Sequence, residues 1–172
     1  MDFYWRRVAV SVLDEASPKQ LDALVLRWFD PQFGPLQEAG VVLGVSTNHC
    51  LMHGVLTWGD AGDVEVAELP VFGGELRTEG EEHPEYGFIG VEVVVLTPDQ
   101  VRQAAGFLRA VPVRQRVRDL DAVMPGVVAD WLFSTPWSEK WADELVTDLL
   151  ELVDFFTAAA DTGDAILKVQ SA

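Results

Sequence analysis

The chain has 172 residues, of which 49% are hydrophobic, and a formal net charge of −16 from 28 acidic and 12 basic residues. This length fits a single domain, residues 1–172, whose core is large enough to need no disulfide or metal for stability. So negative a surface repels phosphate backbones and anionic lipids. This argues against nucleic acids and membranes as partners and is compatible with a basic protein partner.

The cellular compartment is indicated by three features that the sequence lacks. A single cysteine, Cys50, excludes an internal disulfide. The first residues lack the apolar run and cleavage site of a secretion signal. No run reaches the roughly 18 apolar residues of a membrane helix. We therefore expect a cytoplasmic protein, and no pattern calls for a cofactor.

The N-terminal third predicts a strand, a capped helix and an irregular segment. Residues 3–13, FYWRRVAVSVL, are rich in β-branched and aromatic residues, which favours a strand. Residues 17–20, SPKQ, combine the serine, proline and glutamine of a capped helix start. Prolines and a glycine between residues 31 and 35 end this helix and open an irregular stretch.

The middle of the chain predicts a short helix and one strong strand. Ser46 is the expected N-cap of a helix that runs to about Thr57, followed by a loop over residues 58–70. A short strand broken by two glycines leads into an exposed acidic loop at residues 78–87. The nearly continuous apolar run at residues 88–96 predicts a strand in the middle of a sheet.

The C-terminal half is predicted to be mainly helical. Residues 97–100, TPDQ, repeat the capping pattern, and a further helix begins at Pro112. The longest apolar stripe at helical spacing follows Thr135 and Pro136, which are expected to cap it, and a last strand covers residues 165–169. The elements together predict an α+β fold, a small mixed β-sheet packed with about five helices.

Residues 46–170 resemble the YfbM-like family, small bacterial proteins that share a domain of unknown function. The resemblance is carried by the motifs LTWG, VFGG, EYGFIGVEVVVLTPDQV and FFTAAADTGDAILKV. The family usually has a tryptophan–histidine pair and a second histidine before its LLT run. Here the second histidine falls on His53, while His49 and Cys50 occupy the positions of the pair. The resemblance implies an α+β fold and a bacterial cytosolic setting, and it implies no reaction.

Residues 48–54, NHCLMHG, contain the candidate metal ligands His49, Cys50 and His53. Two histidines one helical turn apart share a face, as in zinc hydrolases. In those enzymes a glutamate follows the first histidine as general base, and here that position is Cys50. A structural zinc site needs four ligands, and His83 is the remaining soft donor. We therefore do not favour a metal site, and packed or surface histidines are the simpler interpretation.

Four aromatic residues and one acid are candidate binding residues: Tyr4, Trp5, Trp58, Tyr86 and Glu92. The aromatic residues are expected at strand starts or loop ends, where they could line a groove or pack in the core. Glu92 is the one ionisable residue of the strand at residues 88–96. A desolvated carboxylate there would be a site candidate, and the alternative is an exposed face of the strand.

No nucleophile–base pair, metal cage or phosphate-binding loop is found in the sequence. We therefore expect a non-enzymatic binding or interaction module, antitoxin-like or immunity-like, with a basic partner. Two alternatives remain. One is a metal-dependent hydrolase that uses His49 and His53. The other is a small-ligand sensor with a groove near Trp58 and Tyr86.

Overall fold

The strands carry apolar side chains on both faces, so the sheet needs a layer of helices on each side. The computed structural model describes residues 2–59, 63–131 and 133–171, and its strands form one sheet in the order β2-β1-β5-β4-β3. All four strand pairs are antiparallel. The strands are β1 (Asp2–Val8), β2 (Val42–Ser46), β3 (Glu75–His83), β4 (Gly87–Leu96) and β5 (Ala165–Ser171).

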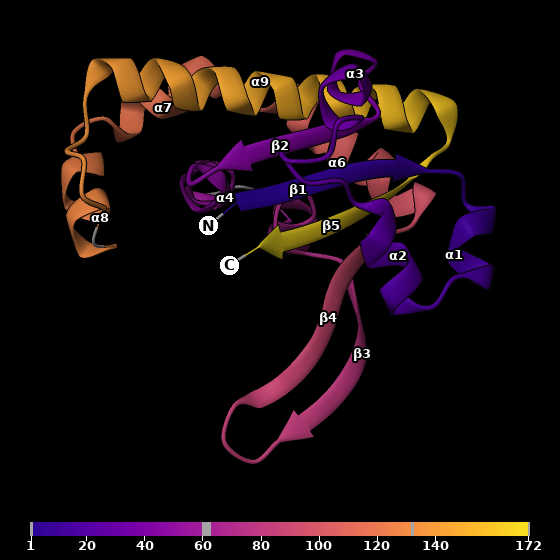
Figure 1. The fold of residues 1–172 in the computed structure, drawn as a ribbon. Coiled ribbons are helices and arrows are strands. Elements are labelled where there is room, and N and C mark those ends of the chain that lie inside the picture. Colours follow the sequence, from indigo (N-terminus) through magenta and orange to yellow (C-terminus); the bar gives the residue numbers. More distant parts are fainter. Residues whose placement is uncertain (1, 60–62, 132, 172) are drawn as a thin grey trace.

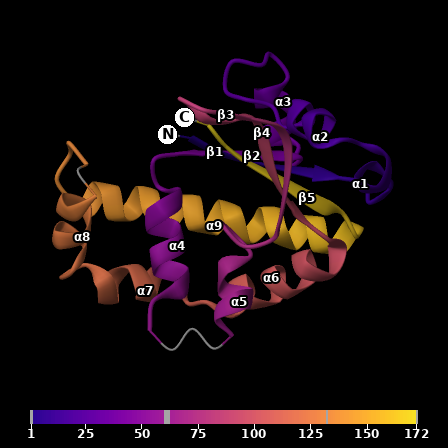
Figure 2. The ribbon, with the colours of Figure 1, turned by 90° about the horizontal axis from the view of Figure 1, so that it is seen from below.

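The described part of the chain has nine helices in addition to this sheet. The short N-terminal helices pack on one face, and the longer helices, with α9 along the sheet, pack on the other (Figures 1 and 2). They are α1 (Ser11–Glu15), α2 (Pro18–Leu24), α3 (Phe33–Glu38), α4 (His49–Thr57), α5 (Val64–Glu68), α6 (Pro98–Ala110), α7 (Val113–Leu120), α8 (Met124–Asp130) and α9 (Glu139–Thr162). None of the described helices is long and apolar enough to cross a membrane.

The alternation of side chains along the strands separates the core into two clusters. In β1, Phe3 and Trp5 point into the larger cluster beneath α4, α6 and α9. Tyr4, between them, points into the smaller cluster with α2 and α3. In β4, Val93 and Val95 are fully buried in the smaller cluster. This period of two agrees with the α+β class, because β1, β2, β4 and β5 each contribute side chains to both layers.

The predicted caps of α2 and α6 are present and alike. Ser17 accepts a hydrogen bond from the backbone N–H of Gln20, whose side chain accepts from the backbone N–H of Ser17. Thr97 and Gln100 form the same reciprocal pair at α6. Two otherwise unsatisfied amides are thereby bonded at each helix start.

The sheet and the helix count differ from the sequence-based expectation. The sheet is antiparallel throughout rather than mixed, because each neighbouring pair of strands runs in opposite directions. Short helices account for the difference from about five helices: α1 and α3 were not expected, and α5 lies in the predicted loop at residues 58–70. Strand β1 ends at Val8 rather than residue 13, because residues 11–15 form α1 and bury Leu13.

Three further boundaries differ. Strand β2 lies in the stretch expected to be irregular, where its backbone pairs with β1. The N-cap of α4 is Asn48 rather than Ser46, and the longest helix is capped by Ser138, whose side chain accepts from the N–H of Trp141. The predicted acidic loop at residues 78–87 is mostly strand β3, which pairs with β4 over its whole length.

Strands β3 and β4 form a long hairpin that leaves the body of the protein. We call residues 75–93 of this hairpin the arm. Figure 1 shows it extending below the sheet, with the turn at its far end. The described pairing of β4 with β5 covers Val94, Val95 and Leu96, so the root of the hairpin lies beside β5 and the rest of the hairpin pairs within itself. The prediction of a central strand therefore holds only for the C-terminal end of β4.

A buried lysine fixes the segment that leads into the arm. Lys168, on the central strand β5, is fully buried and donates to the carbonyl oxygens of Leu69 (2.8 Å), Val71 (2.7 Å) and Gly73. Burial lowers the pKa of Lys168 well below its usual value. The three acceptors match the three N–H groups of an ammonium ion, which favours the protonated form. Residues 69–73 are thereby tied to the sheet just before β3 begins.

Replacing Lys168 with methionine should destabilise the fold strongly. The variant keeps most of the length of the side chain but leaves three inward-facing carbonyl groups without their donor, a loss of about 3 kcal/mol in the free energy of unfolding. Urea denaturation followed by tryptophan fluorescence measures this loss. Lys140→Met is the matched control, because Lys140 is exposed and pairs only with Glu144 on the surface of α9. Equal stabilities for the two variants would contradict the role given to Lys168.

Candidate functional site

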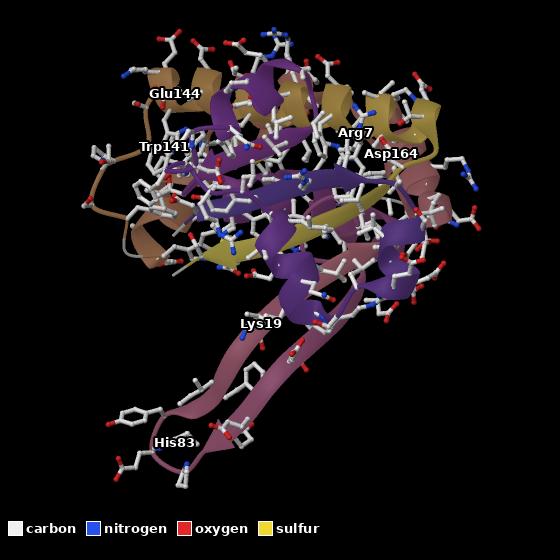
Figure 3. All side chains as sticks on the ribbon, turned by 45° about the vertical axis from the view of Figure 1, so that its right-hand side comes forward. Arg7, Lys19, His83, Trp141, Glu144 and Asp164 are labelled. Carbon is white, nitrogen blue, oxygen red and sulfur yellow. The ribbon has the colours of Figure 1, made fainter. Side chains whose placement is uncertain are left out.

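The arm combines acidic and apolar side chains that solvent can reach. Glu81 and Glu82 are exposed on β3, and Ile89 on β4 is 48% exposed. At the turn, Tyr86 is 74% exposed and stacks on His83, with ring centroids 4.8 Å apart. Figure 3 shows His83 at the far end of the arm. An exposed strand pair with apolar side chains is a typical contact surface for another protein.

Two glycines let the strands of the arm lie flat beneath an aromatic ring. Gly80 and Gly90 face each other across the hairpin. A Cβ atom at Gly80 would lie 2.3 Å from the carbonyl oxygen of Ile89, and one at Gly90 would lie 2.5 Å from that of Glu79. Both would also meet the ring of Phe88, at 2.8 and 2.6 Å. The arm is therefore a packed element rather than a loop, because its backbone approach requires glycine.

The arm is held at its root on the α2 side. The backbone N–H of Lys19 in α2 donates to the carboxylate of Glu79 (3.0 Å), and this hydrogen bond lowers the pKa of Glu79. Arg77 donates to the carbonyl oxygen of Leu13 (3.0 Å) and pairs with Glu75. These contacts orient the lower half of the arm and leave its outer half, residues 80–90, to solvent.

Glu92 lies on an exposed face of β4 at the root of the arm, opposite Thr78 on β3. It lines a small hollow of about 110 Å³ together with Phe72 and Lys168. It also lines a wider hollow between β4 and β5. The carboxylate is therefore at the surface, available to a partner, and not inside an apolar site.

The histidines of α4 are packed against aromatic rings. His49 is 2% exposed, and its ring centroid lies 5.3 Å from that of Phe3 and 6.1 Å from that of Phe72. His53 lies 4.8 Å from Phe72 by the same measure. Neither ring nitrogen of His49 has a hydrogen-bond partner among the residues that the structure describes, and burial lowers the pKa of both histidines. Both imidazoles are thereby favoured in the neutral form.

His49, Cys50 and His53 were the candidates for metal or thiol chemistry. Burial raises the pKa of the Cys50 thiol, which disfavours the nucleophilic thiolate. Among the residues the structure describes, no three histidine, cysteine, aspartate or glutamate side chains converge as metal ligands. His83, the other soft donor, is at the far end of the arm (Figure 3).

Tyr4 and Trp5 lie in the core rather than along a groove. The indole nitrogen of Trp5 donates to the carbonyl oxygen of Pro70 (2.8 Å), next to the segment held by Lys168. The hydroxyl of Tyr4 donates to the carboxylate of Asp2 (3.2 Å), and burial raises the pKa of Tyr4. Both aromatic residues support the sheet and have almost no surface to offer to a partner.

Trp58 lines an apolar groove of about 220 Å³ between α4, α7 and α8. Trp58 and Trp131 are 55% and 47% exposed at this groove, and Gly54 of α4 forms part of its lining. Trp131 carried no signal in the sequence, because only the fold brings α8 beside α4. Tyr86 is on the arm and does not contribute to this groove, so the structure does not bring Trp58 and Tyr86 together.

A polar link joins the start of α4 to α9. Asn48 accepts from the indole nitrogen of Trp141 (2.7 Å) and donates to the carboxylate of Asp148 (2.6 Å). Burial raises the pKa of Asp148. Thr47, just before this link, has φ 64°, an uncommon conformation for a residue with a side chain. These polar atoms satisfy one another, so the link holds α4 in place.

Known proteins resemble this chain in fold but supply no activity. The family model DUF1877, described as a domain of unknown function, matches residues 49–169. The crystal structure of YfbM from Escherichia coli, a protein of unknown function, superposes with a TM-score of 0.52 at 13% identity. The match covers 99% of this chain and 100% of that chain. No curated protein matches the chain.

Filling the floor of the Trp58 groove should stabilise the protein. A Cβ atom at Gly54 would meet nothing within 4 Å, so Gly54→Ala should raise the free energy of unfolding by about 0.5–1 kcal/mol through better helix propensity. Gly44→Ala is the contrasting variant, because its Cβ would lie 2.8 Å from the ring of Phe33 and should destabilise. Thermal unfolding of the two variants checks the geometry, and a destabilised Gly54→Ala would contradict an open groove.

Acid should destabilise the fold partly through His49. Its pKa in the folded state lies below the unfolded value of 6.5, so the unfolded chain binds the proton first as the pH falls. The contribution of neutral His49 to stability is complete above about pH 6.5 and is lost as the pH drops toward the folded-state pKa. His49→Phe should show a shallower loss in urea denaturation between pH 7 and pH 5, a range chosen around that value.

The effect of packing can be separated from the effect of charge. At about pH 8 histidine is neutral in both states, so a difference between wild type and His49→Phe at that pH reports packing alone. The slope of stability against pH, in contrast, reports the protonation of His49. Parallel stability curves for the two proteins across the acidic range would rule out the buried neutral imidazole.

Proposed function

The chain belongs to the DUF1877 family, which has no assigned reaction, and from its surface we propose a non-enzymatic interaction module that binds a basic protein partner through the arm. An antitoxin-like or immunity-like protein is the concrete form of this proposal. The setting we propose is the bacterial cytoplasm. The single cysteine supports it, because no disulfide framework is present.

The arm is the observation that carries this proposal. Its outer half contributes little to either core cluster and exposes apolar side chains such as Ile89 and Tyr86 to water. Isolated two-stranded hairpins have marginal stability, so an exposed one gains from contact with another surface. Burying these side chains against a partner would recover the hydrophobic free energy that the fold leaves unused.

Charge supports a basic partner over other classes. Residues 75–92 contain six acids and one base, Arg77, which already pairs with Glu75. A negative arm on a chain of net charge −16 attracts a positive surface over long range and repels nucleic acid and anionic lipid. An immunity-like protein that covers the basic active surface of an enzyme would have this character. Binding should weaken as the salt concentration rises.

Catalysis receives less support than binding. His49 is enclosed by aromatic rings, and the raised pKa of Cys50 disfavours a thiolate. A small-ligand sensor is the second candidate, and the groove at Trp58 and Trp131 supports it. Among the described residues that line this groove, Asp130 carries the charge that could orient a ligand. The arm exposes both acidic and apolar side chains, so a protein partner is the stronger candidate.

Reversing the charge of the arm should weaken partner binding. The variant Glu81→Lys, Glu82→Lys and Glu85→Lys changes exposed side chains at the outer end of the arm. Basic proteins that co-purify with the tagged wild type are identified by mass spectrometry, and the affinity of the purified partner is then measured for each variant. We expect the arm variant to bind at least about tenfold more weakly, with a flatter salt dependence.

The matched control reverses the same number of charges on another exposed surface. Asp143→Lys, Asp154→Lys and Asp161→Lys change the outer face of α9 by an equal amount. This control should keep most of the affinity, because its charges are not on the arm. If both triple variants lost binding equally, net charge and not the arm would be responsible. If wild type never retained a basic protein, the proposal would be wrong.

A further inference from the structure

The edge of β4 that faces away from β3 has no strand beside it over most of its length. On its β3 side, β4 pairs continuously from Gly87 to Val95. On its other side, the ladder to β5 has three pairs and ends at Val94–Lys168. Beyond that point β4 turns away from the sheet toward the tip of the arm (Figure 1). Residues 87–93 therefore present one backbone edge outside any described ladder.

A hollow of about 420 Å³ lies along this edge, between the diverging strands. Phe88 and Val91 line it from β4, and Val169 lines it from β5. Asp22 and Arg27 close it on the α2 side. Arg27 pairs with Asp22 at 2.8 Å and lies over the ring of Tyr4 at 5.5 Å, so its charge is already engaged within this chain. The hollow therefore has an apolar wall, an acidic residue and a strand edge.

In the described part of the chain, this edge has few of the devices that usually protect exposed strands. Natural edge strands are blocked by charged side chains, above all lysine, by proline, by bulges, or by a covering helix or loop. Residues 87–93, GFIGVEV, contain neither lysine nor proline, and their pairing with β3 is regular, without a bulge. Their one charge is Glu92, which repels acidic segments and attracts basic ones. An unprotected edge with a defined charge is suited to adding a strand from a selected partner.

We propose that the edge of β4 over residues 87–93 binds an extended, basic segment of the partner as an additional β-strand. This inference rests on the proposed function and specifies how the arm binds. Backbone hydrogen bonds would supply affinity, Phe88 and Val91 would receive apolar side chains, and the acids of the arm would pair with basic ones. Charge disfavours a second copy of this chain as the occupant, because it would bring the same excess of acids to the arm.

The probe is a peptide of alternating lysine and valine, long enough to lie along residues 87–93. Two derivatives carry N-methyl groups on alternate residues, one set for each edge of the peptide strand. N-methylation removes hydrogen-bond donors without changing charge or side chains. Each derivative is thus the matched control of the other. Affinity is measured for all three peptides with the full chain, and hydrogen exchange maps the backbone amides that each peptide protects.

The parent peptide should bind and protect amides within residues 87–93. One methylated derivative should bind on the order of a hundredfold more weakly, because about three backbone hydrogen bonds are lost, and the other should bind like the parent. Equal affinity for both derivatives would show attraction by charge alone and overturn strand addition. Absence of binding by the parent, or protection of the same amides by self-association as the protein concentration rises, would also overturn it.

The failure of strand addition is distinguishable from failure of the proposed function. If the charge-reversed arm loses the natural partner while the methylated peptides bind equally, the arm binds a basic partner through side chains. If the charge-reversed arm keeps the partner, the proposed function itself fails, whatever the peptides do.

Discussion

The fold depends on one buried ammonium group that donates hydrogen bonds to the backbone carbonyl groups of an irregular segment. Lys168 on the central strand donates to three backbone carbonyl groups within residues 69–73. The indole of Trp5 on β1 donates to a fourth, that of Pro70. Buried carbonyl groups without donors destabilise a fold, so these two side chains allow an irregular segment to lie in the interior. They also fix the direction in which β3 leaves the body.

The hydrogen bonds of Lys168 and Trp5 lie at the boundary between the packed body of the protein and the exposed arm. Gly74, the residue before β3, has φ 128° and lies against Val94 and Leu96, where a Cβ atom would not fit. The hairpin is therefore anchored tightly at its root. Beyond the root, β4 leaves β5 and its side chains become exposed. The two core clusters hold the buried apolar side chains that stabilise the protein, and the outer half of the arm contributes little to them.

The elements that could be predicted from the sequence are those with a clear capping motif or a clear pattern of buried residues. The caps at Ser17 and Thr97, the root of β4 and the final strand were predicted because capping and burial produce clear patterns. Strand β3 could not be predicted from the sequence. Both of its faces are exposed, so its many acids leave no alternation of apolar and polar residues. Strand β2 was hidden because its five residues are too few to show a period.

The candidate site was predictable only in part, for a related reason. Tyr86 and Glu92 lie on the exposed arm, whereas Tyr4 and Trp5 are buried, and all four are aromatic or acidic residues in or beside strands. Exposure at such positions depends on whether a helix layer covers the strand, which is tertiary information. The role of Lys168 was equally hidden, because its three acceptors lie almost a hundred positions earlier in the chain.

The central claim is that the arm exists for recognition. The structure of the complex with the captured basic partner tests it most directly. The account predicts that most of the surface this chain buries in the complex lies on residues 78–92, with the partner's basic side chains beside the arm's acids. A complex in which the partner covers α9 or the groove at Trp58 while the arm stays exposed to solvent would contradict it.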